Sequence, residues 1–281
     1  MDTSGNTSMK EFFFISGLPR SGSTLLSAIL RQNPEFYADI SSPVQGLAAS
    51  TINVITGSES NHLIDEDRRI SILRAMFNAY YDAVKPPTVF DTSRGWTSKT
   101  TLLKTLFPQT KIICCVRDLP WILDSFERIS TKNTLWNAGL TDDESGQTVT
   151  TRCDALMDVK KAGQVVKPYY FLEEGLLLNP DMIMLVEYEM LCKQPESVMR
   201  ELYGFINKPY FDHDYMNVEY DNEVYDKALN MKSLHTVRKQ VTWQERPSIL
   251  PKSVWDKYSG KEFWRKPAPE FSVKSLYKIK G

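Results

Sequence analysis

The sequence predicts an α/β fold in which a central parallel sheet is flanked by helices. Short apolar segments at 11–16, 88–92, 111–116 and 182–186 are expected to form buried strands. Segments with helical periodicity lie between them, and this alternation is typical of a parallel sheet covered on both faces. Ligands of such sheets bind at the carboxyl ends of the strands, so site residues are expected there.

Helices are predicted between and after these strands. The first covers 23–32 and ends before the pair Asn33-Pro34. Pro120 suits the first turn of a helix over 120–129. The other expected helices cover 68–84, 99–107, 154–174 and 195–205. The polar stretch 133–151 is expected to form a loop or a lid.

Composition favours one soluble domain over 11–281 after a flexible N-terminus at 1–10. The chain has 281 residues, 42% of them hydrophobic, and a formal net charge of −1. This charge does not suggest general attraction to nucleic acid or to an anionic membrane, so neither is expected as a partner and any basic site must be local. The four cysteines show no metal-ligand spacing. Buried, reduced thiols in a cytoplasmic protein without a metal site are therefore expected.

The most informative segment joins the first strand to the first helix. It reads Gly17-Leu18-Pro19-Arg20-Ser21-Gly22-Ser23-Thr24. Gly17 and Gly22 allow the backbone to bend around an anion. The N–H groups and the dipole of the helix start attract that anion, and Arg20 adds a charged fork. Hydroxyl donors are added by Ser21, Ser23 and Thr24.

The same segment departs from the phosphate loop of nucleoside triphosphatases, GxxxxGK[ST]. The glycine spacing and Thr24 fit that pattern, but Ser23 stands where the lysine belongs, and the cation is Arg20 instead. That lysine reaches the β- and γ-phosphates, so its absence argues against transfer of a γ-phosphoryl group. A phosphotransferase that uses ATP is nevertheless kept as an alternative, and an ordinary turn before a helix is another.

The run from Pro19 to Thr24 resembles the 5′-phosphosulfate loop, P-[KR]-S-G-[ST]-T, of sulfotransferases that use 3′-phosphoadenosine-5′-phosphosulfate (PAPS). The resemblance implies a P-loop-like sulfotransferase fold, PAPS as the sulfuryl donor and 3′,5′-adenosine bisphosphate as the product. It also implies that Arg20 binds the donor and acts in catalysis by stabilising charge on the bridging oxygen. Small bacterial and tyrosylprotein sulfotransferases are the most similar in pattern, over 11–42 and 86–130.

A second motif resembles the 3′-phosphate site of this family. Arg117 follows the strand at 111–116, and Ser125 comes eight residues later in the next helix. A helix start and an arginine at a strand end can hold an anion together. Taken alone, Arg117 could equally be a surface ion-pair residue.

Two later segments also resemble nucleotide-contacting parts of the family. Tyr188 follows a strand and matches the tyrosine near the adenine, although an ordinary core aromatic residue is the alternative. Arg238 or Lys239 matches the basic residue that closes over the 3′-phosphate, and a solvated basic face is the alternative.

The proton-accepting base is where the sequence departs from the family. Neither the histidine nor the lysine of other members is present near residues 90–93. Asp91 at a strand end and Asp39 after the first helix are the candidates, and His235 is the third choice. Each aspartate could instead cap a turn. The missing base leaves a catalytically inactive nucleotide-binding protein as a further alternative.

The acceptor is expected to be a hydroxyl or an amine of a small molecule. Small bacterial relatives sulfate secondary metabolites, which implies a place in natural product biosynthesis. The acidic stretches 142–144 and 212–226 could favour a cationic molecule, or they could be solvated surface. A cationic alkaloid of the saxitoxin type is one such acceptor, on a loose overall resemblance.

Overall fold

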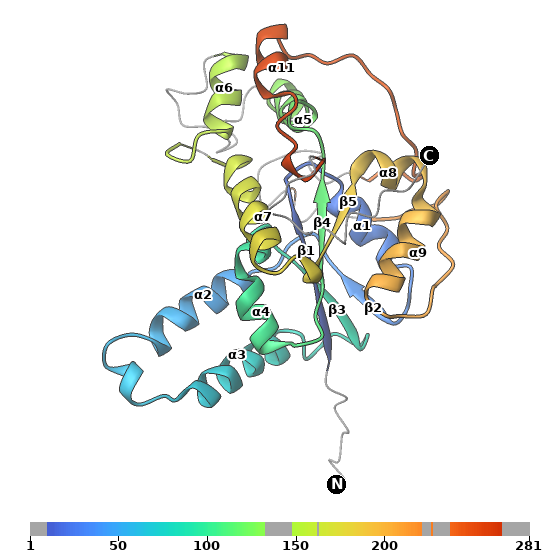
Figure 1. Cartoon of the computed structure of the whole chain (residues 1–281). Coiled ribbons are helices and arrows are strands. Elements are labelled where there is room, and N and C mark those ends of the chain that lie inside the picture. The colour runs from blue at the N-terminus through green and yellow to red at the C-terminus, as the bar shows by residue number, and fades with distance from the viewer. Residues whose placement is uncertain (1–9, 133–147, 162, 221–225, 227–236, 266–281) are drawn as a thin grey trace.

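The computed structural model describes residues 10–132, 148–161, 163–220, 226 and 237–265. Five parallel strands form one sheet in the order β2-β3-β1-β4-β5 (Figure 1). The strands are β1 (Glu11–Gly17), β2 (Phe36–Ala38), β3 (Thr88–Thr92), β4 (Ile112–Val116) and β5 (Ile183–Glu187). The predicted α/β class and four of these strands are confirmed.

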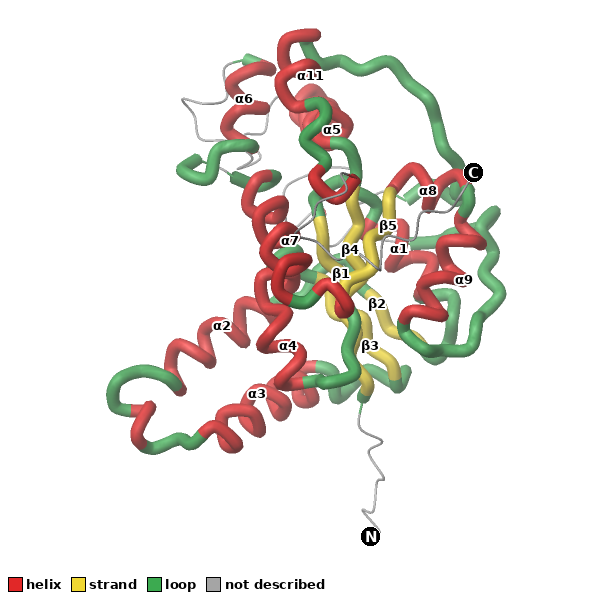
Figure 2. The backbone as a smooth tube through the Cα atoms, viewed as in Figure 1, coloured by secondary structure: helices red, strands yellow, loops and turns green. Residues whose placement is uncertain are grey.

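Helices cover both faces of the sheet (Figure 2). The α-helices are α1 (Ser23–Leu30), α2 (Val44–Ile55), α3 (Glu66–Tyr80), α4 (Thr100–Leu106), α5 (Leu119–Lys132), α6 (Val149–Leu156), α7 (Val166–Leu178), α8 (Tyr188–Lys193), α9 (Pro195–Phe205) and α11 (Lys252–Tyr258). The short 3-10 helices are η1 (Ser60–His62), η2 (Trp96–Lys99), η3 (Pro180–Met182) and η4 (Phe263–Arg265). Within the described ranges, no helix is both long and apolar enough to cross a membrane.

One predicted helix is wrong. The stretch 154–174 forms the end of α6 and most of α7, separated by a turn. Gly163 lies between the two helices with φ +58, and its N–H donates to the carbonyl oxygen of Ala155 in α6 over 3.1 Å, so the chain folds back on α6 before α7 begins. Residues 1–9 and 133–147 are outside the described residues, so the flexible N-terminus and the lid stay predictions.

Two hydrophobic clusters, one on each face, hold the sheet between the helices. In β1, Phe12 and Phe14 pack on the face covered by α3 and α4, while Phe13 and Ile15 pack against α1 and α9. The alternation follows from the period of two along a strand. Cys114 belongs to the first cluster, and its neighbour Cys115 belongs to the second. The cysteines are all free and buried, as the sequence predicted.

The strand order fixes where a ligand can enter. From β1 the chain runs outward to β2 and back to β3, and it then crosses β1 to reach β4 and β5. β1 and β4 are neighbours, and the chain continues from β1 toward the β2 edge of the sheet and from β4 toward the β5 edge. Sheets of this kind bind ligands in the crevice outside the carboxyl ends of two such strands.

Candidate active site

The loop after β1 has a backbone that needs glycine at both ends. Gly17 has φ +104, and a Cβ there would lie 2.2 Å from the carbonyl oxygen of Cys115. Gly22 has φ +94, and a Cβ there would lie 2.7 Å from the ring of Tyr188. Arg20, between them, also has a positive φ of 57°. The loop therefore bends tightly against β4 and α8 in a way that other residues would obstruct.

The first turn of α1 opens directly onto this loop. Ser23 and Thr24 are its first residues, and both are half-buried. The first N–H groups of a helix have no partner within it, so they are available to an anion. Ser21 differs from the other hydroxyl residues because it is fully buried, and its Oγ donates to the carbonyl oxygen of Pro19 over 3.2 Å. Ser21 thus shapes the loop from inside.

The structure brings the two predicted anion sites into contact. Arg20 Nε donates a hydrogen bond to Ser125 Oγ over 3.1 Å. Arg117 Nη1 lies 3.4 Å from the carbonyl oxygen of Arg20. Because β1 and β4 are adjacent strands, the loop after β1 and the residues after β4 line one continuous site.

The electrostatics of this site favour an anion. Burial and the charges of Arg94 and Arg117 lower the pKa of Arg20 to about 10. Burial also lowers the pKa of Arg117. Arg117 Nε is buried and has no hydrogen-bond partner among the described residues. Three cations gathered at one end of the sheet repel one another, and an anion between them would relieve that repulsion.

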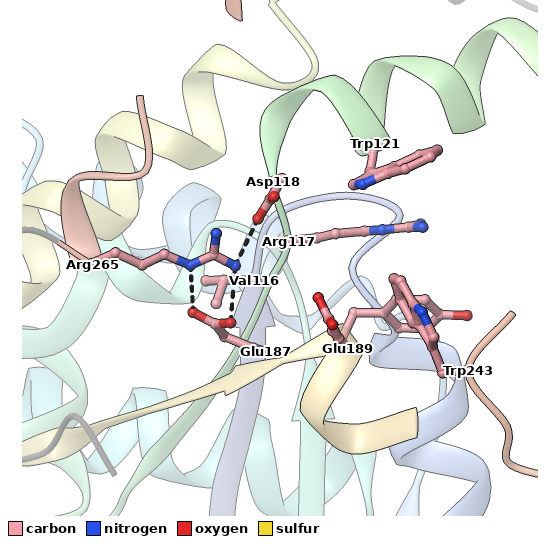
Figure 3. A pocket seen from close by; sticks show the side chains of 9 residues that line it. Val116, Arg117, Asp118, Trp121, Glu187, Glu189, Trp243 and Arg265 are labelled. Carbon is pink, nitrogen blue, oxygen red and sulfur yellow. Dashed lines mark hydrogen bonds and ion pairs between the residues drawn. The ribbon is translucent and has the colours of Figure 1, made fainter. Parts of the chain in front are cut away.

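Aromatic side chains enclose Arg117. Its guanidinium lies 4.5 Å from the ring centroid of Tyr188 and 5.9 Å from that of Trp121. Trp243 lies 6.0 Å from Tyr188, ring to ring, and lines the same pocket (Figure 3). The sequence pointed to Tyr188 but to neither tryptophan, since neither lies in a motif. Flat rings beside a guanidinium offer a surface on which a planar base can stack.

The C-terminal part of the chain is attached to α5 beside this site. The attachment point is Asp124, which is fully buried next to Ser125. Its carboxylate accepts hydrogen bonds from Arg246 Nη2 over 2.6 Å and from the backbone N–H of Ile249 over 2.9 Å. Arg246 in turn lies 5.8 Å from the ring of Trp121. Asp124 and Arg246 were not identified from the sequence, because their pairing joins residues 122 positions apart.

The structure distinguishes the two basic residues predicted to close over the nucleotide. Arg238 is near enough to Tyr188 for its charge to oppose the rise in the pKa of that phenol, which burial causes. Lys239 is largely exposed and lies 3.9 Å from Glu219 at the surface. Arg238 is itself exposed but lies within electrostatic range of Tyr188, whereas Lys239 lies in a surface ion pair.

Asp91 is buried completely at the carboxyl end of β3. Its carboxylate accepts hydrogen bonds from Ser42 Oγ over 2.6 Å, Tyr81 Oη over 2.5 Å and Trp96 Nε1 over 2.6 Å. Burial raises the pKa of Asp91, and these three donors act in the opposite direction. Tyr81 and Trp96 are buried, whereas Ser42 is half-buried, so Ser42 is the one of these three donors that solvent can reach.

Asp39 is half-buried and follows the edge strand β2. It accepts hydrogen bonds from the hydroxyls of Tyr37 and Tyr220, the former over 3.3 Å. Tyr37 and Tyr81 pack edge to face with ring centroids 5.7 Å apart, and Tyr81 holds Asp91. The two candidate bases thus belong to one polar aromatic cluster. The third choice, His235, lies outside the described residues, as does the acidic stretch 142–144.

Comparisons with known proteins agree with this geometry. The profile of the sulfotransferase family matches residues 13–212. A sulfotransferase domain from the curacin biosynthetic pathway superposes with a TM-score of 0.50, at 20% identity over 94% of both chains. At this identity the likeness shows the fold, and that fold is the P-loop-like fold of sulfotransferases.

Two further solved structures are similar at lower scores. The sulfotransferase domain of the Synechococcus PCC 7002 olefin synthase has a TM-score of 0.48, with 17% identity over 94% of this chain and 98% of its own. A sulfotransferase from Alicyclobacillus acidocaldarius has a TM-score of 0.47, with 14% identity over 78% of this chain and 89% of its own. No curated protein sequence matches this chain.

Proposed function

Because this chain belongs to the sulfotransferase family, we propose that it transfers a sulfuryl group from PAPS to a hydroxyl or an amine of a small molecule. One observation carries the proposal: the glycine-bounded loop after β1 and the arginine after β4 meet at the point where the strand order reverses. A donor with separate 5′- and 3′-phosphates requires two adjacent anion sites, and the meeting of this loop with Arg117 at the carboxyl ends of β1 and β4 supports such a donor.

The residues present fit such a donor. A Cβ at Gly22 would lie 2.7 Å from the ring of Tyr188, so the absence of a side chain there lets the loop pack directly against this ring. The buried Nε of Arg117 has no hydrogen-bond partner among the described residues, so it could donate to a phosphate. Arg20 and the first turn of α1 would hold the 5′-phosphosulfate end. Arg117, Ser125 and Arg238 would hold the 3′-phosphate. Tyr188, with Trp121 and Trp243 in the same pocket, would contact the adenine.

Catalysis follows from charges that are already in position. When bound, PAPS supplies an activated sulfuryl group. Arg20 and the N–H groups at the start of α1 stabilise the negative charge that develops on the departing phosphate. Because their positions are fixed by the loop and the helix, they need little rearrangement as the reaction proceeds. Arg94, whose charge lowers the pKa of Arg20, adds positive potential from the end of β3.

We assign the acceptor's proton to Asp91, through Ser42. β3 is the strand beside β1, and Asp91 is the register partner of Phe14, whereas Asp39 follows the edge strand. The acceptor hydroxyl or amine gives its proton to Ser42 Oγ while Ser42 gives its own proton to Asp91 Oδ2. Fully buried, Asp91 cannot touch the acceptor itself.

Rate measurements against pH distinguish the two aspartates. Asp91→Asn should lower kcat by about a hundredfold or more, as for the loss of a general base. The base must be ionised, so the rate of the wild-type enzyme should fall as the pH drops through the raised pKa of Asp91. This fall in rate on the acidic side of the pH profile, the acidic limb, should therefore occur above about pH 4, which is near the usual pKa of an aspartate.

Asp39→Asn is the matched variant and should keep this limb, whereas Ser42→Ala should lose activity as Asp91→Asn does. In Asp91→Asn the indole N–H of Trp96 can still donate to the amide oxygen of the new side chain, so the fold should survive this change. A limb that persists in Asp91→Asn and vanishes in Asp39→Asn would assign the base to Asp39.

A thermal-unfolding assay tests the donor. Adding 3′,5′-adenosine bisphosphate at about a hundredfold excess over its Kd should raise Tm by about 5 °C or more. Arg117→Ala should lose most of this shift, and Arg200→Ala, a surface change on α9, should keep it. ATP with magnesium should have a much smaller effect. Stabilisation by ATP alone would favour the phosphotransferase instead.

The acceptor class is the finer part of the proposal. The polar aromatic cluster with Asp39 and Asp91 supports a small acceptor that carries hydrogen-bond donors. A cationic alkaloid of the saxitoxin type is a first molecule to screen, with neutral phenols as the comparison. Four buried, unpaired cysteines support a reducing compartment such as the cytoplasm. Binding of the bisphosphate without sulfation of any acceptor would favour the inactive alternative.

A further inference from the structure

We propose that Arg265 is a positioning residue that neutralises two carboxylates beside the donor site and thereby raises the affinity for the 3′-phosphate end of the nucleotide. This inference rests on the proposed function. Arg265 comes from η4, the last described turn of the chain, and more than 140 positions separate it from the residues after β4.

Arg265 binds both carboxylates at once. Its Nε lies 2.8 Å from Glu187 Oε1, and its Nη2 lies 2.9 Å from Glu187 Oε2. The same Nη2 lies 2.7 Å from Asp118 Oδ1. Figure 3 shows the guanidinium between the two acidic side chains. The planar fork of arginine suits this arrangement, because two parallel hydrogen bonds hold one carboxylate and a third reaches the other.

The two carboxylates adjoin residues of the nucleotide site in the chain. Asp118 follows Arg117 directly, and Glu187 directly precedes Tyr188. Val116 and Glu187 are register partners at the carboxyl ends of β4 and β5, so the acidic residues come from neighbouring strand ends. These residues line one pocket together with Arg265.

Without Arg265, these charges would oppose an anion in that pocket. Two unpaired carboxylates at the strand ends would repel a phosphate and would compete for the guanidinium of Arg117. In the structure they face Arg265, while the side chain of Arg117 extends away from it, toward Trp121 and Trp243 (Figure 3). The buried Nε of Arg117 consequently stays available.

The hydrogen bonds to Glu187 raise the pKa of Arg265, which keeps the guanidinium charged over the whole working range of pH. Asp118, Glu187 and Arg265 are each between 29% and 40% exposed. Solvent therefore screens the pair, and the expected effect on affinity is moderate.

The experiment measures the Kd of 3′,5′-adenosine bisphosphate by titration calorimetry. Arg265→Gln should weaken binding about tenfold, or about 1.4 kcal/mol. The double variant Arg265→Gln/Glu187→Gln, which also removes one unpaired carboxylate, should recover to within about threefold of wild type. Arg265→Lys should retain most of the affinity because it retains the charge. The matched control is Arg200→Gln, which breaks the exposed ion pair with Glu196 on α9 and should leave Kd unchanged.

Salt gives an independent readout of the same mechanism. The loss caused by Arg265→Gln should shrink between about 0.05 and about 0.5 M salt, since screening weakens the repulsion by the carboxylates. A merely structural clamp predicts the opposite pattern: a lower Tm, no recovery in the double variant and no dependence on salt. That pattern, or an Arg265→Gln protein that binds as tightly as wild type, would overturn this inference alone. Absence of bisphosphate binding by the wild-type chain would overturn the proposed function together with it.

Discussion

Replacing Arg20 with alanine is expected to lower kcat by about a hundred- to a thousandfold, which is typical for the loss of one preorganised donor to a developing oxyanion. Arg20 lies in the loop that opens α1, and its Nε donates a hydrogen bond to Ser125, a residue of the proposed 3′-phosphate site. This hydrogen bond holds the guanidinium at the carboxyl end of the sheet, where we propose that the donor binds. The measurement is the release of 3′,5′-adenosine bisphosphate from PAPS in the presence of an acceptor found by screening.

The same variant should fold at least as well as wild type. Burial and the charges of Arg94 and Arg117 lower the pKa of Arg20 to about 10, so at neutral pH the charged form is less favourable in the folded chain than in the unfolded one. This penalty is present below the lowered pKa and would be relieved only as the pH rises through it. Arg20→Ala removes the penalty, and Tm should stay unchanged or rise.

Arg20→Lys separates charge from geometry. Lysine keeps the positive charge but loses the fork that donates to Ser125, so an intermediate rate is expected. Arg200→Ala on α9 is the surface control and should keep normal turnover. Near-normal turnover in Arg20→Ala would remove this residue from the mechanism, and a large fall in Tm would assign it a structural role instead.

The strands were predictable because their apolar runs are short and unambiguous. Residues 112–116 are entirely buried, and a continuous apolar run this short and rich in β-branched residues is typical of a strand in the interior of a sheet. β2 was missed because Phe36–Ala38 has three residues and shows no measurable period. α2 was missed because only Val44, Ala48 and Ile55 of its residues are buried, which leaves a weak apolar face.

The site was predictable where its residues adjoin strand ends in the sequence. Arg20 and Arg117 follow β1 and β4 within a few positions, and parallel strands bring such positions together. Trp243 and Arg265 reach the same pocket from the C-terminal region, and spacing along the chain carries no information about such contacts. The sequence likewise could not show that Lys239 pairs with Glu219 while Arg238 lies within electrostatic range of Tyr188.

Gly17→Ala should have the largest effect on stability. A Cβ at this position would lie 2.2 Å from the oxygen and 2.6 Å from the nitrogen of Cys115, and both atoms belong to the backbone of β4. Backbone in a sheet cannot turn aside as a flexible side chain can, so β1 and β4 would have to separate at their carboxyl ends. The φ of +104° adds strain for any residue with a side chain.

We expect a loss of at least about 3 kcal/mol in the free energy of unfolding, together with loss of the Tm shift caused by the bisphosphate. Gly204→Ala in α9 is the matched control: a Cβ there meets no atom within 4 Å, and alanine should gain up to about 1 kcal/mol in a helix. The two changes add the same methyl group, so a difference between them reports the closeness of β1 to β4. A Gly17→Ala protein that is as stable as wild type and still binds the bisphosphate would contradict this prediction. It would show that the loop can accommodate a Cβ beside the backbone of Cys115. The donor site could then not depend on the tight bend that brings Arg20 to Ser125.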